Sequence, residues 1–178
     1  MCKVLVDLSF IIRNFFPILL QKREKKIAKI LTDKKLKIAF AESCTGGLLS
    51  SRMTDLSGSS SYIMQNFITY ANRAKVSLLD VNNETIKQHG VVSEQVAIEM
   101  AKGLSEKYEC DIAVSITGIA GPTGGSKEKP VGLAYACIAD KNNYKTFKIQ
   151  KNQNLSRRLM KYAFSNDVFD YLIKFLSY

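Results

Sequence analysis

Hydrophobic residues fall into short continuous runs, separated by longer segments in which they recur every three to four positions. The short runs are rich in β-branched, aromatic or small apolar residues, which is typical of strands. They predict strands over residues 37–41, 63–70, 111–116, 131–139 and 144–149. The last two runs flank a polar turn, so together they predict a hairpin.

Segments with the helical period lie between and around these runs. They predict helices over residues 22–32, from residue 45 to a stop at 57–59, over 72–79, from residue 93 onward and over about 154–176. Asn72 and Ser93 are expected to cap their helices, because Asn and Ser side chains accept hydrogen bonds from free backbone amides. Strands interleaved with helices predict the α/β class, here a three-layer α/β/α sandwich with a mixed central sheet.

The chain divides into an N-terminal apolar extension, residues 1–21, and one domain, residues 22–178. Residues 8–20 are strongly apolar, but Arg13 and Pro17 interrupt them and the run is too short to span a bilayer. The segment also lacks the basic start and small-residue cleavage site of a signal peptide. We interpret it as an amphipathic extension that packs on the domain or on a partner subunit. Attachment to a membrane surface is the alternative.

The net charge of +10 is unevenly distributed along the chain. Residues 1–37 carry a net charge of +7 and residues 145–178 carry +5, whereas residues 38–144 carry −2. A nucleic-acid-binding protein usually concentrates basic residues, interleaved with aromatic residues, on its binding face. The pattern here indicates solvated basic helix faces and no specific nucleic-acid partner. Salt-sensitive DNA binding by the basic flanks is the alternative.

Cysteine and histidine usage argues against a zinc site. The cysteines are scattered, without a Cys-x-x-Cys pair, and His89 is the only histidine. The four cysteines are Cys2, Cys44, Cys110 and Cys137. Reduced thiols and the lack of a signal peptide predict a cytoplasmic protein.

Glycine usage marks two loops, which together hold six of the ten glycines. Residues 41–47 (AESCTGG) and residues 117–125 (TGIAGPTGG) each directly follow a predicted buried strand. Ligands of α/β sheets bind beyond the carboxyl ends of the strands, and glycines let backbone amides approach an anion closely. The two loops therefore predict a ligand site, with ordinary turn glycines as the alternative.

Ser43 lies at the turn from a strand to a helix, where a nucleophile is exposed. A serine hydroxyl needs a base, and His89 is unpromising because it lies at what looks like a helix end, where a structural histidine is expected. A lysine whose pKa is lowered by burial could act instead, and Lys75 is the candidate. Its spacing alone would favour an ordinary surface lysine. Cys44 is a rival nucleophile, intrinsically more reactive than Ser43.

Five segments of the chain together resemble a known family. They are 41–47 (AESCTGG), Tyr70-x-Asn72-x-Ala74-Lys75, 90–94 (GVVSE), 115–126 (SITGIAGPTGGS) and 129–132 (KPVG). They resemble the C-terminal domain of the competence/damage-inducible protein CinA, over roughly residues 22–176. Motifs of this length and order are far more specific than an isolated glycine pattern.

The resemblance implies an α/β/α sandwich, usually a homodimer, that needs no metal or organic cofactor. Stand-alone members of the family hydrolyse nicotinamide mononucleotide to nicotinic acid mononucleotide and ammonia in NAD salvage. The resemblance implies Ser43 as the nucleophile and Lys75 as the base, with Tyr70 beside them to relay the proton where transfer is not direct. A non-catalytic nucleotide-binding module with the same loops is the alternative function.

Substrate contacts are expected in both loops and at two further positions. These residues are Cys44, Thr45, Gly46, Gly47, Asn72, Thr117, Gly118, Gly121, Pro122, Gly124, Gly125 and Arg157. The first loop would stabilise an oxyanion through its amides, and the second would hold ribose or phosphate.

The chain departs from the family before its last helix. Family members often carry Gly-Asp-Arg followed by a second arginine four residues later. Residues 151–153 (KNQ) replace that triplet, while Arg157 matches the later arginine. The departure puts one polar or phosphate contact in doubt, for which Arg157, Arg158 or Lys151 could compensate.

Overall fold

The computed structural model describes residues 21–177 of the chain. The predicted extension, residues 1–21, lies almost wholly outside this range. The helices are α2 (Lys22–Asp33), α3 (Leu48–Thr54), a 3₁₀ turn η1 (Ser59–Ser61), α4 (Asn72–Leu79), α5 (Asn83–His89), α6 (Glu94–Tyr108) and α7 (Arg157–Leu176). The strands are β1 (Ile38–Glu42), β2 (Ile63–Ile68), β3 (Ile112–Gly118), β4 (Leu133–Ala139) and β5 (Tyr144–Gln150). None of the helices in this described range is both long and apolar enough to span a membrane.

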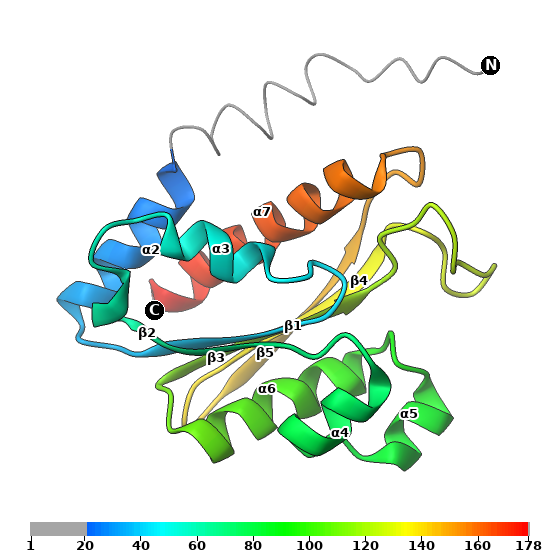
Figure 1. The fold of residues 1–178 in the computed structure, drawn as a ribbon, viewed down its shortest axis with the longest axis horizontal. Coiled ribbons are helices and arrows are strands. Elements are labelled where there is room, and N and C mark those ends of the chain that lie inside the picture. Colours follow the sequence, from blue (N-terminus) through cyan, green and yellow to red (C-terminus); the bar gives the residue numbers. More distant parts are fainter. Residues whose placement is uncertain (1–20, 178) are drawn as a thin grey trace.

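The strands form one mixed sheet in the order β2-β1-β3-β4-β5. Strand β1 pairs in parallel with β2 and β3, whereas β3–β4 and β4–β5 are antiparallel. The carboxyl ends of β1, β2 and β3 therefore lie at the same edge, where β4 begins. Both glycine-rich loops leave the sheet at this edge (Figure 1).

Helices cover both faces of the sheet, which confirms the predicted α/β fold (Figure 1). One face packs against α2, α3 and α7, and its core includes Phe40, Phe164 and Phe169. The other face packs against α4 and α6, with small strand residues such as Ala39 against helix residues such as Met100, and α5 packs against α6. Strand β1 is buried throughout, because it lies between two strands and two helical layers.

Helix boundaries are where the sequence-based expectations need correction. Ser93 caps α6 as predicted, accepting a hydrogen bond from the Val96 amide. Asn72 does not cap α4: it is the first helical residue, and Ala71 precedes it without a side-chain cap. The last helix begins at Arg157, because Ser156 accepts from the Leu159 amide and caps it there.

A buried polar network fixes α3 against the neighbouring helices. Arg52 of α3 donates from Nε to Glu24 Oε1 of α2 at 2.6 Å. It also donates from Nη1 to Ser165 Oγ at 2.5 Å and to Asn166 Oδ1 at 3.0 Å, both on α7. Breaking a buried ion pair costs more than breaking an exposed one, so this network holds α3 and the loop before it in place.

Candidate active site

The two glycine-rich loops and the segment after β2 enclose a cavity of about 250 Å³. It opens at the carboxyl edge of the parallel strands, where α/β proteins bind their ligands. The lining residues are Ser43, Cys44, Tyr70, Asn72, Lys75, Val91, Gly118, Ile119, Ala120, Gly121, Thr123, Gly124 and Arg157. The predicted nucleophile and the predicted base thus lie in one cavity, although they are far apart in the sequence.

Ser43 lies at the turn that leads from β1 to α3. Its amide donates to the Ile116 carbonyl of β3 at 3.1 Å, so the first turn residue is still held by the sheet. Its carbonyl accepts from the Gly46 amide at 3.1 Å, which closes the turn. Gly46 and Gly47 have φ values of 62° and 89°, a backbone region that glycine adopts without strain. The turn leaves Ser43 only 9% exposed but lining the cavity.

Lys75 is fully buried and contacts Ser43 directly. Its Nζ donates to Ser43 Oγ at 3.0 Å and to the Thr69 carbonyl at 2.6 Å. Burial lowers the pKa of Lys75 from the ordinary value of 10.5 to about 8. None of the carboxylates in the described range forms an ion pair with this ammonium. The expectation from spacing alone, an ordinary surface lysine, is therefore wrong.

Once Lys75 loses its proton, the same contact reverses its direction. The neutral amine has a lone pair that can accept the Ser43 hydroxyl proton across the 3.0 Å separation. That separation lies within the reach expected for a general base and its nucleophile. A pKa of about 8 leaves an appreciable neutral fraction near neutral pH.

Cys44 is poorly placed as a nucleophile although it also lines the cavity. Burial, together with the negative charge of Glu42, raises the pKa of the Cys44 thiol to about 12. The thiolate is the reactive form of cysteine, so the thiol is inert near neutral pH. Burial thus lowers the pKa of Lys75 and raises the pKa of Cys44, because it disfavours the charged form of each group.

Glu42 is a site residue that sequence reasoning missed. It is fully buried and accepts hydrogen bonds from the Leu49 amide at 3.1 Å and the Ser50 amide at 2.8 Å. Ser50 Oγ donates to the same carboxylate at 2.7 Å. Glu42 thus supplies the N-terminal cap that Gly47, which has no side chain, cannot give to α3. The signal was an acidic residue at the end of β1, one short loop before a helix whose N-cap position, Gly47, has no side chain.

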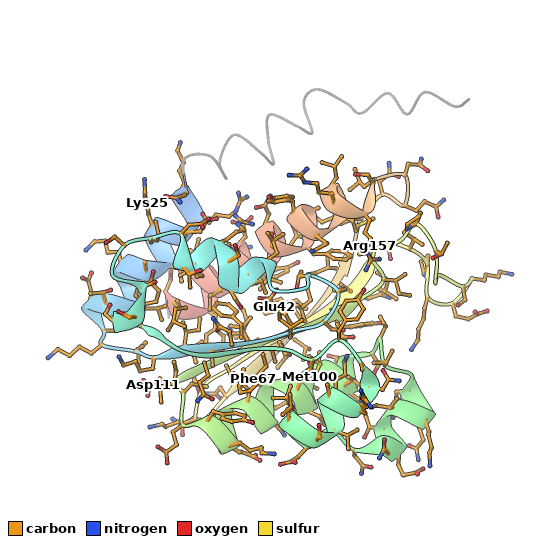
Figure 2. All side chains as sticks on the ribbon, in the orientation of Figure 1. Lys25, Glu42, Phe67, Met100, Asp111 and Arg157 are labelled. Atoms are coloured by element: carbon orange, nitrogen blue, oxygen red, sulfur yellow. The ribbon has the colours of Figure 1, made fainter. Side chains whose placement is uncertain are left out.

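Arg157 joins the second loop to Tyr70 across the cavity mouth. Arg157 is the first residue of α7 (Figure 2). It donates to the Gly121 carbonyl at 2.7 Å and to the Tyr70 hydroxyl at 2.5 Å. Tyr70 is 59% exposed. Its hydroxyl contacts Arg157 and not the Ser43–Lys75 pair, while its carbonyl lies 3.5 Å from Lys75 Nζ. This geometry needs no tyrosine between the serine and the lysine.

The remaining predicted contacts divide between the cavity and its supporting loops. Asn72, Gly118, Gly121 and Gly124 line the cavity. The buried Thr117 hydroxyl instead donates to the Val91 carbonyl at 2.9 Å and so links the second loop to the segment before α6. The other predicted residues outside the lining are Thr45, Gly46, Gly47, Pro122 and Gly125.

Four lining residues were not predicted: Val91, Ile119, Ala120 and Thr123. Val91 belongs to the quoted segment 90–94, but a single valine carries no chemical signal. The other three stand between the glycines of the second loop, where only the loop's folded path decides which side chains face inward.

Known proteins share both the sequence and the fold of this chain. A family model, the CinA C-terminal domain, matches residues 20–176. A CinA-like protein of Syntrophomonas wolfei is 54% identical over 114 residues, which are 64% of this chain and 27% of that protein. A putative competence-damage inducible protein of Halothermothrix orenii is 43% identical over 154 residues, which are 86% of this chain and 37% of that protein. The chain thus spans about a third of the length of these curated relatives.

Solved structures agree with this assignment. The crystal structure of the competence/damage inducible protein CihA from Agrobacterium tumefaciens is similar, with a TM-score of 0.85 and 36% identity, over 89% of this chain and 96% of that one. A competence or damage-inducible protein from Enterobacter asburiae has a TM-score of 0.83 and 27% identity, over 88% of this chain and 98% of that one. The family model, the relatives and the folds coincide on the same residues, and the chain belongs to the CinA C-terminal domain family.

Proposed function

We propose that the chain hydrolyses the carboxamide of nicotinamide mononucleotide, giving nicotinic acid mononucleotide and ammonia, with Ser43 as nucleophile and Lys75 as base. The observation that carries the proposal is the 3.0 Å contact between Lys75 Nζ and Ser43 Oγ in a buried cavity. A lysine with a pKa of about 8 and no ion-pair partner in the described range is suited to proton transfer.

The first half of the reaction forms an acyl-enzyme. Neutral Lys75 takes the Ser43 proton while Oγ bonds to the carboxamide carbon, whose oxygen becomes an oxyanion. When this tetrahedral intermediate collapses, the Lys75 ammonium returns a proton to the nitrogen, and the C–N bond breaks to release ammonia. Lys75 is then neutral again.

The second half of the reaction hydrolyses the ester. Water attacks the acyl carbon while Lys75 accepts a proton from it. The bond from carbon to Ser43 Oγ breaks, and the serine oxygen recovers its proton from Lys75. The carboxylic acid gives its remaining proton to solvent and leaves as a carboxylate, so the enzyme returns to its starting state.

The oxyanion is expected to bind the amides of the first loop. In that loop the Ser43 amide donates to the Ile116 carbonyl, and the Gly46 amide donates to the Ser43 carbonyl. The Leu49 and Ser50 amides of α3 donate to the Glu42 carboxylate. We assign the oxyanion to the Cys44 amide, which follows the nucleophile directly and belongs to a residue that lines the cavity. One such donor is typically worth about 3–4 kcal/mol in the transition state.

The substrate's own charge helps a modest nucleophile. The pyridinium ring withdraws electrons from the carboxamide, and its positive charge next to Lys75 favours the neutral form of the amine. The second loop and Arg157 would hold the ribose and phosphate, because they surround the cavity mouth with backbone groups and a guanidinium.

Ammonia release tests the proposal directly. Purified protein is incubated separately with nicotinamide, nicotinamide riboside and nicotinamide mononucleotide, and ammonia is measured over time. We expect turnover of the mononucleotide at the highest kcat/KM of the three. Binding of the mononucleotide without ammonia from any of them would instead support the alternative, a non-catalytic nucleotide-binding module.

The homodimer implied by the family resemblance stays a prediction. What supports it is a set of exposed apolar side chains along edge strand β2 and its flanks: Met64 and Ile68 on β2, Tyr70 beyond its end and Leu78 on α4. Exposed apolar residues on an edge strand favour association with another chain.

A further inference from the structure

The family resemblance places residues 151–153 (KNQ) where Gly-Asp-Arg is often found, which puts one polar or phosphate contact in doubt that another cation could supply. Lys151 is already engaged, because its Nζ pairs with Asp167 of α7 at 2.7 Å. Arg158 is exposed and has no hydrogen bond or ion pair to another described residue. Arg157 lines the cavity, but it is the arginine that the family pattern already contains.

Lys161 is a further cation that the sequence did not single out. It lies on α7 one helical turn beyond Arg157, and residues four apart occupy the same helix face. Its Nζ sits over the first glycine-rich loop: a methyl group built on Gly46 would lie only 3.3 Å from that nitrogen. A side chain at this position would therefore crowd the ammonium of Lys161.

The position of Gly46 brings Lys161 close to the chemistry. Gly46 closes a turn with Ser43, and residues related in this way have Cα atoms within about 7 Å of each other. Lys161 is half-buried, and it forms no ion pair or hydrogen bond with another residue of the described range. A half-buried ammonium without a protein anion beside it is suited to an anionic ligand.

Arg157 complements this ammonium from the side of the second loop. Its two contacts, to Gly121 and Tyr70, leave other guanidinium N–H groups free to donate. A planar guanidinium and a compact ammonium are the two side chains that proteins use for phosphate. Arg157 lines the Ser43 cavity, whereas Lys161 lies beside Gly46 in the loop that carries Ser43.

We propose that Lys161, together with Arg157, forms the site for the substrate's phosphomonoester, and that Lys161 supplies the cation that the altered triplet lacks. This inference rests on the proposed function, since it places the phosphate of the nucleotide whose amide reacts at Ser43. The ring then points to Ser43 and Lys75, and the phosphate lies toward the N-terminal half of α7.

The test compares Lys161→Met with Arg158→Met on two substrates that differ only in the phosphate. For Lys161→Met we expect kcat/KM for nicotinamide mononucleotide to fall at least about tenfold, the usual effect of removing a charged hydrogen bond. Its kcat/KM for nicotinamide riboside should stay at the wild-type value. Arg158→Met, which removes a neighbouring exposed cation, should leave both values unchanged.

A binding measurement separates this inference from the proposed reaction. Calorimetric titration of Ser43→Ala, with and without Lys161→Met, gives the Kd of the mononucleotide when nothing turns over. Weaker binding of the mononucleotide alone upholds the phosphate site even if the wild-type protein releases no ammonia. Two results with an active wild-type protein would overturn the phosphate site and leave the proposed amidase unaffected. One is an unchanged kcat/KM for the mononucleotide in Lys161→Met. The other is an equal fall of kcat/KM for the riboside and the mononucleotide.

Discussion

Replacing Ser43 with alanine is expected to lower ammonia release from nicotinamide mononucleotide by about a thousandfold or more. Removing the nucleophile of a serine hydrolase leaves only the contribution of the oxyanion site and of substrate binding. Cys44→Ala should stay within a few-fold of wild type, because the thiol, with a pKa of about 12, takes no part in the reaction. The measurement is kcat and kcat/KM for both variants under identical conditions.

The Ser43 and Cys44 variants control for each other. The two residues are adjacent, both line the cavity and both are nearly buried, so general damage to the loop would affect them alike. Circular dichroism and thermal unfolding establish that each variant folds. A Ser43→Ala protein that keeps its rate, beside a Cys44→Ala protein that loses it, would move the nucleophile to the cysteine.

Lys75→Met is expected to abolish turnover to a similar extent and yet to stabilise the domain. Methionine fills a comparable space without a charge, so the hydroxyl of Ser43 loses its base while the cavity wall is kept. Activity should fall by about a thousandfold or more, since residues that act as one unit lose nearly the whole effect when either is removed. An active Lys75→Met protein would show that another group activates Ser43.

The stability change follows from the lowered pKa of Lys75. In the folded protein this pKa is about 8, against 10.5 ordinarily, so between these values the unfolded chain holds a proton that the folded chain has released. The wild-type free energy of unfolding therefore rises with pH in this window, and below it the cost of burying a charged amine is fully present. Lys75→Met should be more stable than wild type below pH 8, with the difference shrinking as pH rises toward 10.5.

A matched control for Lys75→Met is Lys87→Met on α5. Lys87 is exposed and pairs with Glu84 three residues earlier, an interaction worth little. This variant should keep both its rate and its unfolding midpoint at every pH. A Lys75→Met protein less stable than wild type at pH 7 would mean that the bonds of Nζ to Ser43 and Thr69 outweigh the cost of burial.

The sequence predicted the sheet and the place of Ser43 at a turn beside the cavity because these depend on local patterns. Strands β1 and β3 are continuous apolar runs buried between two layers, and few other structures suit such runs. Ser43 could be located because a turn rich in glycine directly follows β1. The family resemblance then supplied the partner, Lys75, which its spacing alone did not.

Interactions between distant segments were not accessible from local patterns. The burial of Lys75 depends on how α4 packs beside Thr69 and Ser43. In the sequence, the first turn of α4 does not differ from an ordinary polar helix start. The capping role of Glu42 and the approach of Lys161 to Gly46 need the placement of α3 and α7 on the sheet. Helix α5 went unrecognised apart from its end at His89, because its sequence is polar and only Ile86 packs partly against the core.

The pH dependence of kcat/KM tests the role of Lys75 most directly, because it reports the ionisation of the free enzyme. Above pH 7 the substrate phosphate, with a second pKa of about 6, stays fully charged and does not contribute. We expect kcat/KM for nicotinamide mononucleotide to rise about tenfold in total between pH 7 and 10, with most of the rise below pH 9, as Lys75 becomes neutral. A profile that is flat from pH 7 to 10, or that falls through this range, would contradict an uncharged Lys75 as the base for Ser43.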